Sequence, residues 1–104
     1  DGGKIGIITS RMGSVEDNGS GAYYGYRASK AAVNAIGKSL AVDLAPRRIA
    51  VFLLHPGRVG TNMLGGRGDI GPDDAAANLI ARLDGLTLAE TGSFWHANGT
   101  PLPW

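Results

Sequence analysis

The longest apolar run of this sequence is Ile49-Ala50-Val51-Phe52-Leu53-Leu54. The run is continuously apolar, it is too short for a helix of its own, and His55-Pro56-Gly57 stops it. Such a run is typical of a strand that is covered on both faces, as in a parallel sheet flanked by helices. We therefore expect a buried strand over residues 49–54.

The residues before this run predict a helix that begins at Tyr26. Several alanines add helix propensity, and Pro46 ends the helix because the residue before a proline is pushed away from helical geometry. Side chains recur at three- and four-residue spacing, which is one face of a helix. The members of this expected buried face are Ser29, Val33, Ile36, Leu40 and Leu44.

The two ends of the chain complete an alternating pattern. Residues 5–9 predict a short strand with both faces covered, and residues 93–97 predict another strand. Pro72-Asp73-Asp74 opens a helix that ends at Gly85, since proline and acids suit a first turn. Its expected apolar face is Ala76, Leu79, Ile80 and Leu83.

The order strand, helix, strand, helix, strand predicts an α/β fold with parallel strands. In such sheets ligands bind at the carboxyl ends of the strands. The segments to watch are therefore residues 10–25 and 55–71, which are both rich in glycine.

Composition narrows the class of function. A chain of 104 residues is long enough for one small domain, and a net charge of +1 from scattered basic residues gives no patch for nucleic acid or a membrane. There is no cysteine for a disulfide or a catalytic thiol, and no stretch resembles a signal peptide or a membrane span. We expect a cytoplasmic protein whose partner is a small molecule or another protein.

Tyr26 and Lys30 are the candidate catalytic pair. They lie four residues apart, on one face of the expected helix, and an ammonium beside a phenol favours the phenolate that proton transfer requires. Ser10, at the end of the first strand, offers a hydroxyl that can orient a substrate oxygen. Taken alone, however, a tyrosine and a lysine at this spacing also occur on ordinary helix surfaces, so the pair has a purely structural interpretation as well.

Three ordered motifs resemble the short-chain dehydrogenase/reductase family. They are ITSRMG at residues 8–13, YRASK at residues 26–30 and HPGRVGT at residues 55–61. The resemblance covers essentially the whole chain and is strongest to the subgroup of C-factor-like and sniffer-like carbonyl reductases. It implies an α/β fold that forms the C-terminal part of a Rossmann-like, doubly wound parallel sheet.

The resemblance implies a role for each of the three candidate catalytic residues. Tyr26 would be the general acid/base, Lys30 would assist it and hold the ribose hydroxyls of the cofactor, and Ser10 would steady the substrate carbonyl. The implied reaction is hydride transfer between NADP or NAD and a carbonyl or secondary alcohol, as in an NAD(P)-dependent oxidoreductase.

The third motif is implied to bind the cofactor together with Tyr26 and Lys30. Val59 would present backbone groups to the nicotinamide carboxamide, Thr61 would reach the same region, and Pro56 and Gly57 would shape the turn.

The family's glycine-rich pyrophosphate turn is missing. We expect residues 1–104 to be a single partial domain, the C-terminal catalytic half, with the N-terminal dinucleotide-binding half absent. Its first strand would then need a partner, either that missing half or a second copy in a homo-oligomer. The expected partners are a small carbonyl or alcohol substrate, with no nucleic acid and no membrane.

Two further interpretations concern function and metals. A non-enzymatic, C-factor-like role in cell signalling or interaction is the alternative to an oxidoreductase. His55 and His96 have no third ligand at metal-like spacing, so we expect no metal and structural roles for both.

Overall fold

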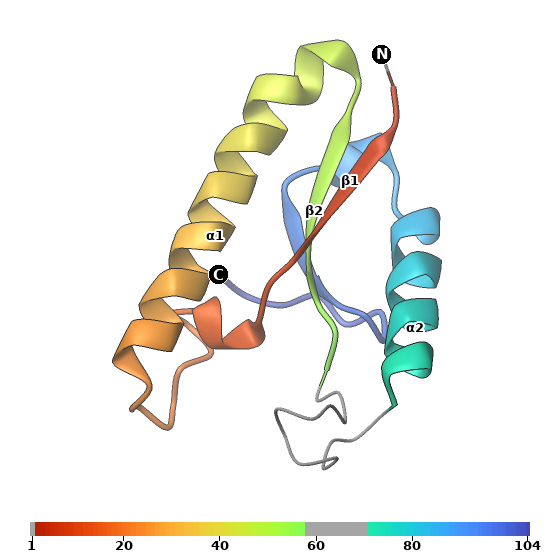
Figure 1. Ribbon diagram of the computed structural model, residues 1–104. Helices are drawn as coiled ribbons and strands as arrows, with labels where there is room; N and C mark the ends of the chain where they lie inside the picture. Colours follow the sequence, from red (N-terminus) through yellow and green to blue (C-terminus); the bar gives the residue numbers. More distant parts are fainter. Residues whose placement is uncertain (1, 58–70) are drawn as a thin grey trace.

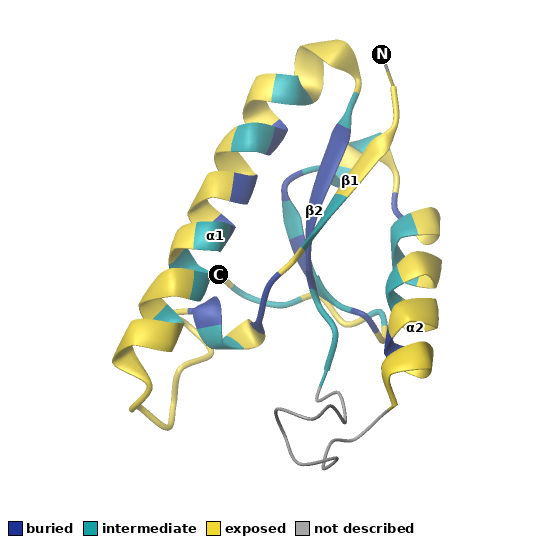
Figure 2. Ribbon diagram, viewed as in Figure 1, coloured by how far each residue is buried: buried dark blue, intermediate teal, exposed yellow. Residues whose placement is uncertain are grey.

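The apolar run at residues 49–54 becomes the central strand of a three-stranded parallel sheet. In this computed structural model, which describes residues 2–57 and 71–104, strand β2 (Ala50–His55) lies between β1 (Lys4–Ile8) and β3 (Ser93–His96). Its residues from Ala50 to Leu54 are at most 2% exposed, and Figure 2 shows this strand as the buried centre of the sheet. The prediction of a strand covered on both faces is confirmed.

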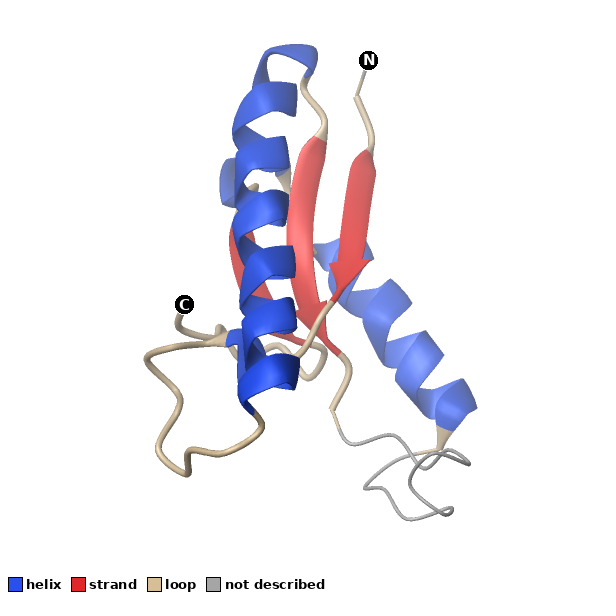
Figure 3. Cartoon of the chain, turned by 60° about the vertical axis from the view of Figure 1, so that its left-hand side comes forward, coloured by secondary structure: helices blue, strands red, loops and turns tan. Residues whose placement is uncertain are grey.

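The two long helices cover opposite faces of the sheet. Helix α1 (Tyr24–Leu44) packs against one face and α2 (Pro72–Gly85) lies on the other, so that the sheet is the middle layer (Figures 1 and 3). The α/β class and the alternation of strands and helices are as expected. Short 3-10 turns join them: η1 (Arg11–Gly13), η2 (Ala45–Arg47) and η4 (Leu88–Glu90).

Helix α1 differs from the prediction in its start and in its buried face. It begins at Tyr24, two residues earlier than expected, and its buried residues are Asn34, Gly37 and Ala41. Ile36, which was expected inside, is 66% exposed, and Ser29 is exposed as well. The helix approaches β2 through small side chains, because a Cβ at Gly37 would lie 2.8 Å from Cδ2 of Leu53. The other expected members, Val33, Leu40 and Leu44, are half-buried.

Helix α2 has the predicted bounds, with Asp73 and Asp74 in its first turn. Leu79 and Leu83 pack on the core cluster that includes Phe52 and Leu54. The rest of the expected face was wrong: Ala76 is exposed and Ile80 is 63% exposed, while Ala75 is buried in their place.

Strand β1 is less covered than expected. It pairs with β2 along one side only, and Ile5 and Ile8 are 37% and 52% exposed. The prediction that both of its faces are covered was therefore wrong for the residues described, because α1 packs over β2 rather than over β1.

The C-terminal tail returns to the sheet and to the first loop. The Trp104 ring stacks on Phe94 at a centroid distance of 5.5 Å, and the Val15 amide donates to the carbonyl oxygen of Trp104 at 2.6 Å. Trp95 packs against the core cluster. Within the described part of the chain, no helix combines the length and the apolar character that crossing a membrane would require.

Candidate active site

Ser10 lies at the carboxyl end of β1, where the chain leaves the sheet. The amide of Thr9 still donates to the carbonyl oxygen of Leu54 at 2.9 Å, which extends the ladder by one residue. Ser10 then caps η1, and its Oγ accepts a hydrogen bond from the amide of Met12 at 3.1 Å. The residue is 7% exposed. Its hydroxyl is therefore fixed in place by its own turn.

Gly13 brings this turn against the helix that carries the candidate pair. A Cβ at Gly13 would lie 2.7 Å from the carbonyl carbon of Lys30, a distance that real Cβ atoms do not tolerate. Only glycine allows η1 and α1 to approach this closely. The sequence signal was a glycine three residues after the serine, but sequence reasoning gave it no role.

Tyr26 and Lys30 lie on one face in the first two turns of α1, as their spacing predicted. The ammonium of Lys30 is 5.6 Å from the centroid of the Tyr26 ring, within the range of a cation–π contact. Tyr26 is 47% exposed, so its hydroxyl is accessible to a ligand. The neighbouring phenols are more exposed still, at 67% for Tyr23 and 86% for Tyr24.

Arg27, inside the same motif, ties down the loop that leads into the helix. Its guanidinium donates to the carbonyl oxygens of Ala22 at 2.9 Å and Gly21 at 3.1 Å, and to Oγ of Ser20 at 3.0 Å. Ala22 and Tyr23 both have positive φ values, 59° and 58°, which are uncommon for residues other than glycine. The arginine thus stabilises the backbone path that sets the start of α1.

Thr9 and Asn34 form a buried hydrogen bond between the end of β1 and helix α1. The hydroxyl of Thr9 donates to Oδ1 of Asn34 at 2.8 Å, and both residues are at most 4% exposed. Within the described residues, Nδ2 of Asn34 has no hydrogen-bond partner. Sequence reasoning missed this asparagine, although a polar residue four positions after Lys30, one turn further along the helix, was the available signal.

The third motif is described only in part. Pro56 and Gly57 follow β2 at the carboxyl edge of the sheet, and Gly57 has a φ of 89°, which favours glycine. The predicted cofactor contacts of Val59 and Thr61 lie outside the described residues.

Two histidines occupy the carboxyl ends of β2 and β3. His55 pairs with His96 across the sheet, and their rings meet edge to face at a centroid distance of 5.0 Å. Burial, followed by the nearby His96 and Arg11, lowers the pKa of His55 to about 4, against a smaller opposing effect of Asp17. Burial also lowers the pKa of His96. Both rings are therefore neutral at physiological pH.

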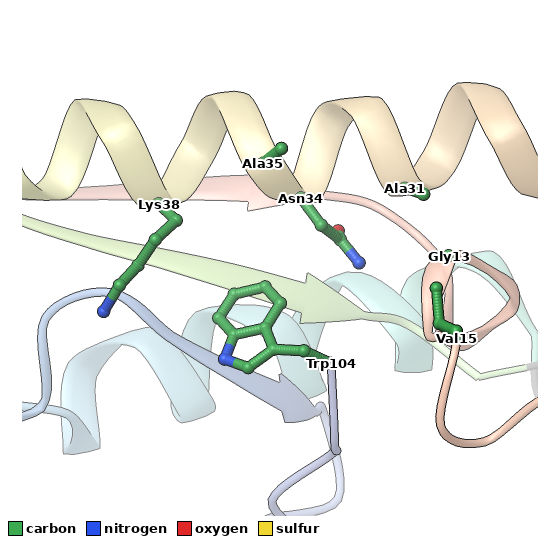
Figure 4. Close-up of a pocket in the computed structure, with 7 residues that line it drawn as sticks. All are labelled: Gly13, Val15, Ala31, Asn34, Ala35, Lys38 and Trp104. Atoms are coloured by element: carbon green, nitrogen blue, oxygen red, sulfur yellow. The ribbon is translucent and has the colours of Figure 1, made fainter.

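The cavity drawn in Figure 4 adjoins the contact between the Ser10 turn and α1, because Gly13 and Asn34 are among its lining residues. It has a volume of about 360 Å³ and lies between α1 and Trp104. Its lining does not include Ser10, Tyr26 or Lys30. The residues that line it are Gly13, Val15, Ala31, Asn34, Ala35, Lys38 and Trp104.

The fold is a Rossmann-like α/β fold, because a parallel sheet lies between two helical layers. The candidate active site lies at the carboxyl edge of this sheet, where the Ser10 turn packs against the helix that carries Tyr26 and Lys30. Residues 1–69 match the family described as short chain dehydrogenase. The chain therefore belongs to the short-chain dehydrogenase family.

Two curated relatives align with nearly the whole chain. A 1-hydroxy-2-glutathionyl-2-methyl-3-butene dehydrogenase of Rhodococcus sp. (strain AD45) is 46% identical over 108 residues, covering 100% of this chain and 48% of the relative. The C-signal protein of Myxococcus xanthus is 39% identical over 101 residues, covering 97% of this chain and 61% of the relative. The chain thus spans about half the length of these relatives.

Solved structures of carbonyl reductases share the fold. The carbonyl reductase Sniffer of D. melanogaster superposes with a TM-score of 0.90 at 39% identity, covering 97% of this chain and 41% of that one. The NADPH-bound carbonyl reductase from chicken fatty liver gives 0.86 at 29% identity, with 97% and 42% covered. The resemblance to the sniffer-like subgroup is confirmed by the first of these.

Proposed function

We propose that the protein containing this chain is an NAD(P)-dependent oxidoreductase that reduces a carbonyl or oxidises a secondary alcohol. The observation that carries the proposal is the close packing of the Ser10 turn, through Gly13, on the helix turn of Lys30, with Tyr26 exposed one turn earlier. The dehydrogenase and carbonyl reductase names of its relatives support the same chemistry.

In this proposal the hydroxyls of Ser10 and Tyr26 have complementary tasks. Oγ of Ser10 already accepts from the Met12 amide, so its hydrogen is free to donate to a substrate oxygen. Tyr26 is accessible and gives or takes the proton at that oxygen. The ammonium of Lys30, beside the tyrosine ring, stabilises negative charge as the proton moves.

The described residues fit one end of a nicotinamide cofactor, NADP or NAD. An exposed phenol and an ammonium on one helix face can hydrogen-bond a ribose diol. The Pro56-Gly57 turn follows β2 at the carboxyl edge of the sheet, where the ligands of such sheets bind. When bound, the nicotinamide supplies or accepts the hydride. The proposed contacts of Val59 and Thr61 belong to this end, while the pyrophosphate would bind in the half that the relatives carry beyond this chain.

We further propose that the substrate is a small molecule. The side of β1 that is unpaired among the described residues is covered either by a second copy in a homo-oligomer or by the other half of an intact chain. The signalling alternative is not favoured, since the match to C-signal adds no observation that separates it from an enzyme of the same family.

Replacing Tyr26 by phenylalanine tests the proposed function. We define the full-length form as this chain completed to the length of its relatives, with the added half placed before residue 1, where we propose that the dinucleotide is bound. In that form, Tyr26→Phe should lower turnover of a carbonyl substrate with NADPH or NADH by at least about 10²-fold, because the proton-transferring hydroxyl is lost. Cofactor binding, followed by energy transfer from Trp95 and Trp104 to the nicotinamide, should change little.

Tyr24→Phe is the matched control, because it removes a phenol that has no lysine four residues later. It should keep turnover within about twofold, the range of surface substitutions. Turnover by Tyr26→Phe at the wild-type rate would refute the catalytic assignment.

A further inference from the structure

The backbone on both sides of Ser10 is hydrogen-bonded to β2. On the N-terminal side, the amide of Thr9 donates to the main-chain oxygen of Leu54. On the C-terminal side, the amide of Arg11 donates to Nδ1 of His55 at 3.2 Å. The side chain of His55 thus takes over from the main-chain acceptors at the point where β1 leaves the sheet.

This histidine ring is itself held in one orientation. Its edge-to-face contact with His96 packs it from the side of β3, and its main-chain oxygen accepts from the amide of Ala97 at 2.9 Å. Pro56 follows and restricts the backbone after it. The acceptor that faces Arg11 is therefore built on rigid elements.

From these contacts we infer that His55 is a positioning residue for the proposed reaction: by accepting the amide of Arg11, it fixes the turn that presents the hydroxyl of Ser10. This inference rests on the proposed function. His55 acts through the backbone and does not touch the reacting atoms. Sequence spacing gives no sign of this role of His55, because Arg11 and His55 are 44 residues apart.

The hydrogen bonds separate this role from the other uses of a histidine pair. Nδ1 of His55 accepts from the amide of Arg11, which is distant in sequence. Nδ1 of His96 accepts at 3.0 Å from the amide of Asn98, which is only two residues away. In the part of the chain that the structure describes, no group of three or more His, Cys, Asp or Glu side chains is arranged to hold a metal. The contact to Arg11 is thus the feature that distinguishes the two rings.

The experiment compares His55→Leu with His55→Asn in the full-length form. Leucine fills similar space without an acceptor, whereas Oδ1 of asparagine can occupy nearly the place of Nδ1. We expect His55→Leu to lower kcat about tenfold, with KM for the cofactor changed by less than twofold, and His55→Asn to restore kcat to within about threefold of wild type. His96→Phe, which keeps an aromatic ring beside His55 and leaves the acceptor of Arg11 in place, is the control and should keep kcat within about threefold.

Amide hydrogen exchange at Arg11 gives a readout that does not depend on turnover. The amide should exchange slowly in the wild type and in His55→Asn, and at least about tenfold faster in His55→Leu. Equal loss of kcat in His55→Leu and His96→Phe, failure of asparagine to rescue, or an unchanged Arg11 amide would each overturn the inference. If the wild type turned over no carbonyl or alcohol, the proposed function would fail, and so would the role of His55 in positioning Ser10 for that reaction. The exchange rate of the Arg11 amide would still show whether His55 holds the turn.

Discussion

At Gly13 the fold leaves no room for a side chain. The turn that carries Ser10 meets the main chain of Lys30 there, and a Cβ would lie 2.7 Å from the carbonyl carbon and 2.8 Å from the oxygen. Backbone atoms of a helix cannot yield as the tip of a flexible side chain can. The close contact of two site-bearing elements therefore depends on one residue.

Gly13→Ala should both destabilise the protein and disturb the site. We expect the free energy of unfolding of the full-length form to fall by about 1–3 kcal/mol, because overpacking forces the backbone apart, and turnover to fall with it. Urea denaturation measures the first effect. Gly25→Ala is the control: nothing lies within 4 Å of its Cβ position, so it should be neutral or stabilising by up to about 1 kcal/mol. Equal stability of the two variants would contradict this account of Gly13.

Sequence patterns predicted the placement of those candidate residues that depends on local spacing. Tyr26 and Lys30 share a helix face because they are four residues apart, and Ser10 follows a recognisable strand. The parts played by Gly13 and His55 were not predictable in this way. Each depends on a contact with a segment distant in sequence, which no periodicity records.

Among the elements, α1 shows why hydrophobic periodicity misread a buried face. Hydrophobic periodicity depends on large apolar side chains, whereas the helix lies close to β2 through Gly37 and Ala41. Ile36 and Val42 are 66% and 63% exposed. Small residues signal close approach rather than exposure. Strand β2, apolar from Ala50 to Leu54, and the proline-initiated α2 were predictable because each carries its own local signal.

His55 and His96, at the carboxyl ends of β2 and β3, should make the free energy of unfolding depend on pH. Unfolded histidines bind a proton near pH 6.5, whereas in the folded protein the pKa of His55 is about 4 and that of His96 is also lowered. The unfolded state thus takes up more protons as the pH falls, and stability should decrease between about pH 7 and pH 5. Among the described residues, the groups whose charges act on His55 are Arg11, Asp17 and the titratable His96.

Thermal unfolding of the full-length form at pH 7, 6 and 5 measures this effect. His55→Asn cannot titrate, so its melting temperature should fall less over this range than that of the wild type. The pKa of Glu90 is lowered from 4.5, so this carboxylate adds its own loss of stability only at more acidic pH. Parallel pH profiles for wild type and variant would show that His55 is not the source.

For the whole molecule, the fold is a sheet with one side of β1 unpaired among the described residues. The strand order is β1-β2-β3, and the chain covers 48% of its Rhodococcus relative and 41% of the Sniffer structure. A row of free backbone groups at a sheet edge invites another strand. We expect the part of the relatives' length that lies outside this chain to supply that strand in the full-length form.

The amides of β1 provide a direct test of this arrangement. Thr9 donates to Leu54, so by the alternation of a ladder the amides of Ile5 and Ile7 also face β2, whereas those of Gly6 and Ile8 face away from it. In the full-length form, Gly6 and Ile8 should exchange as slowly as Ile7, because a strand on the far side accepts from them. Ile7 serves as the internal control. If Gly6 and Ile8 exchanged rapidly while Ile7 remained protected, β1 would be a true edge in the intact protein, and the N-terminal half would have to pack elsewhere.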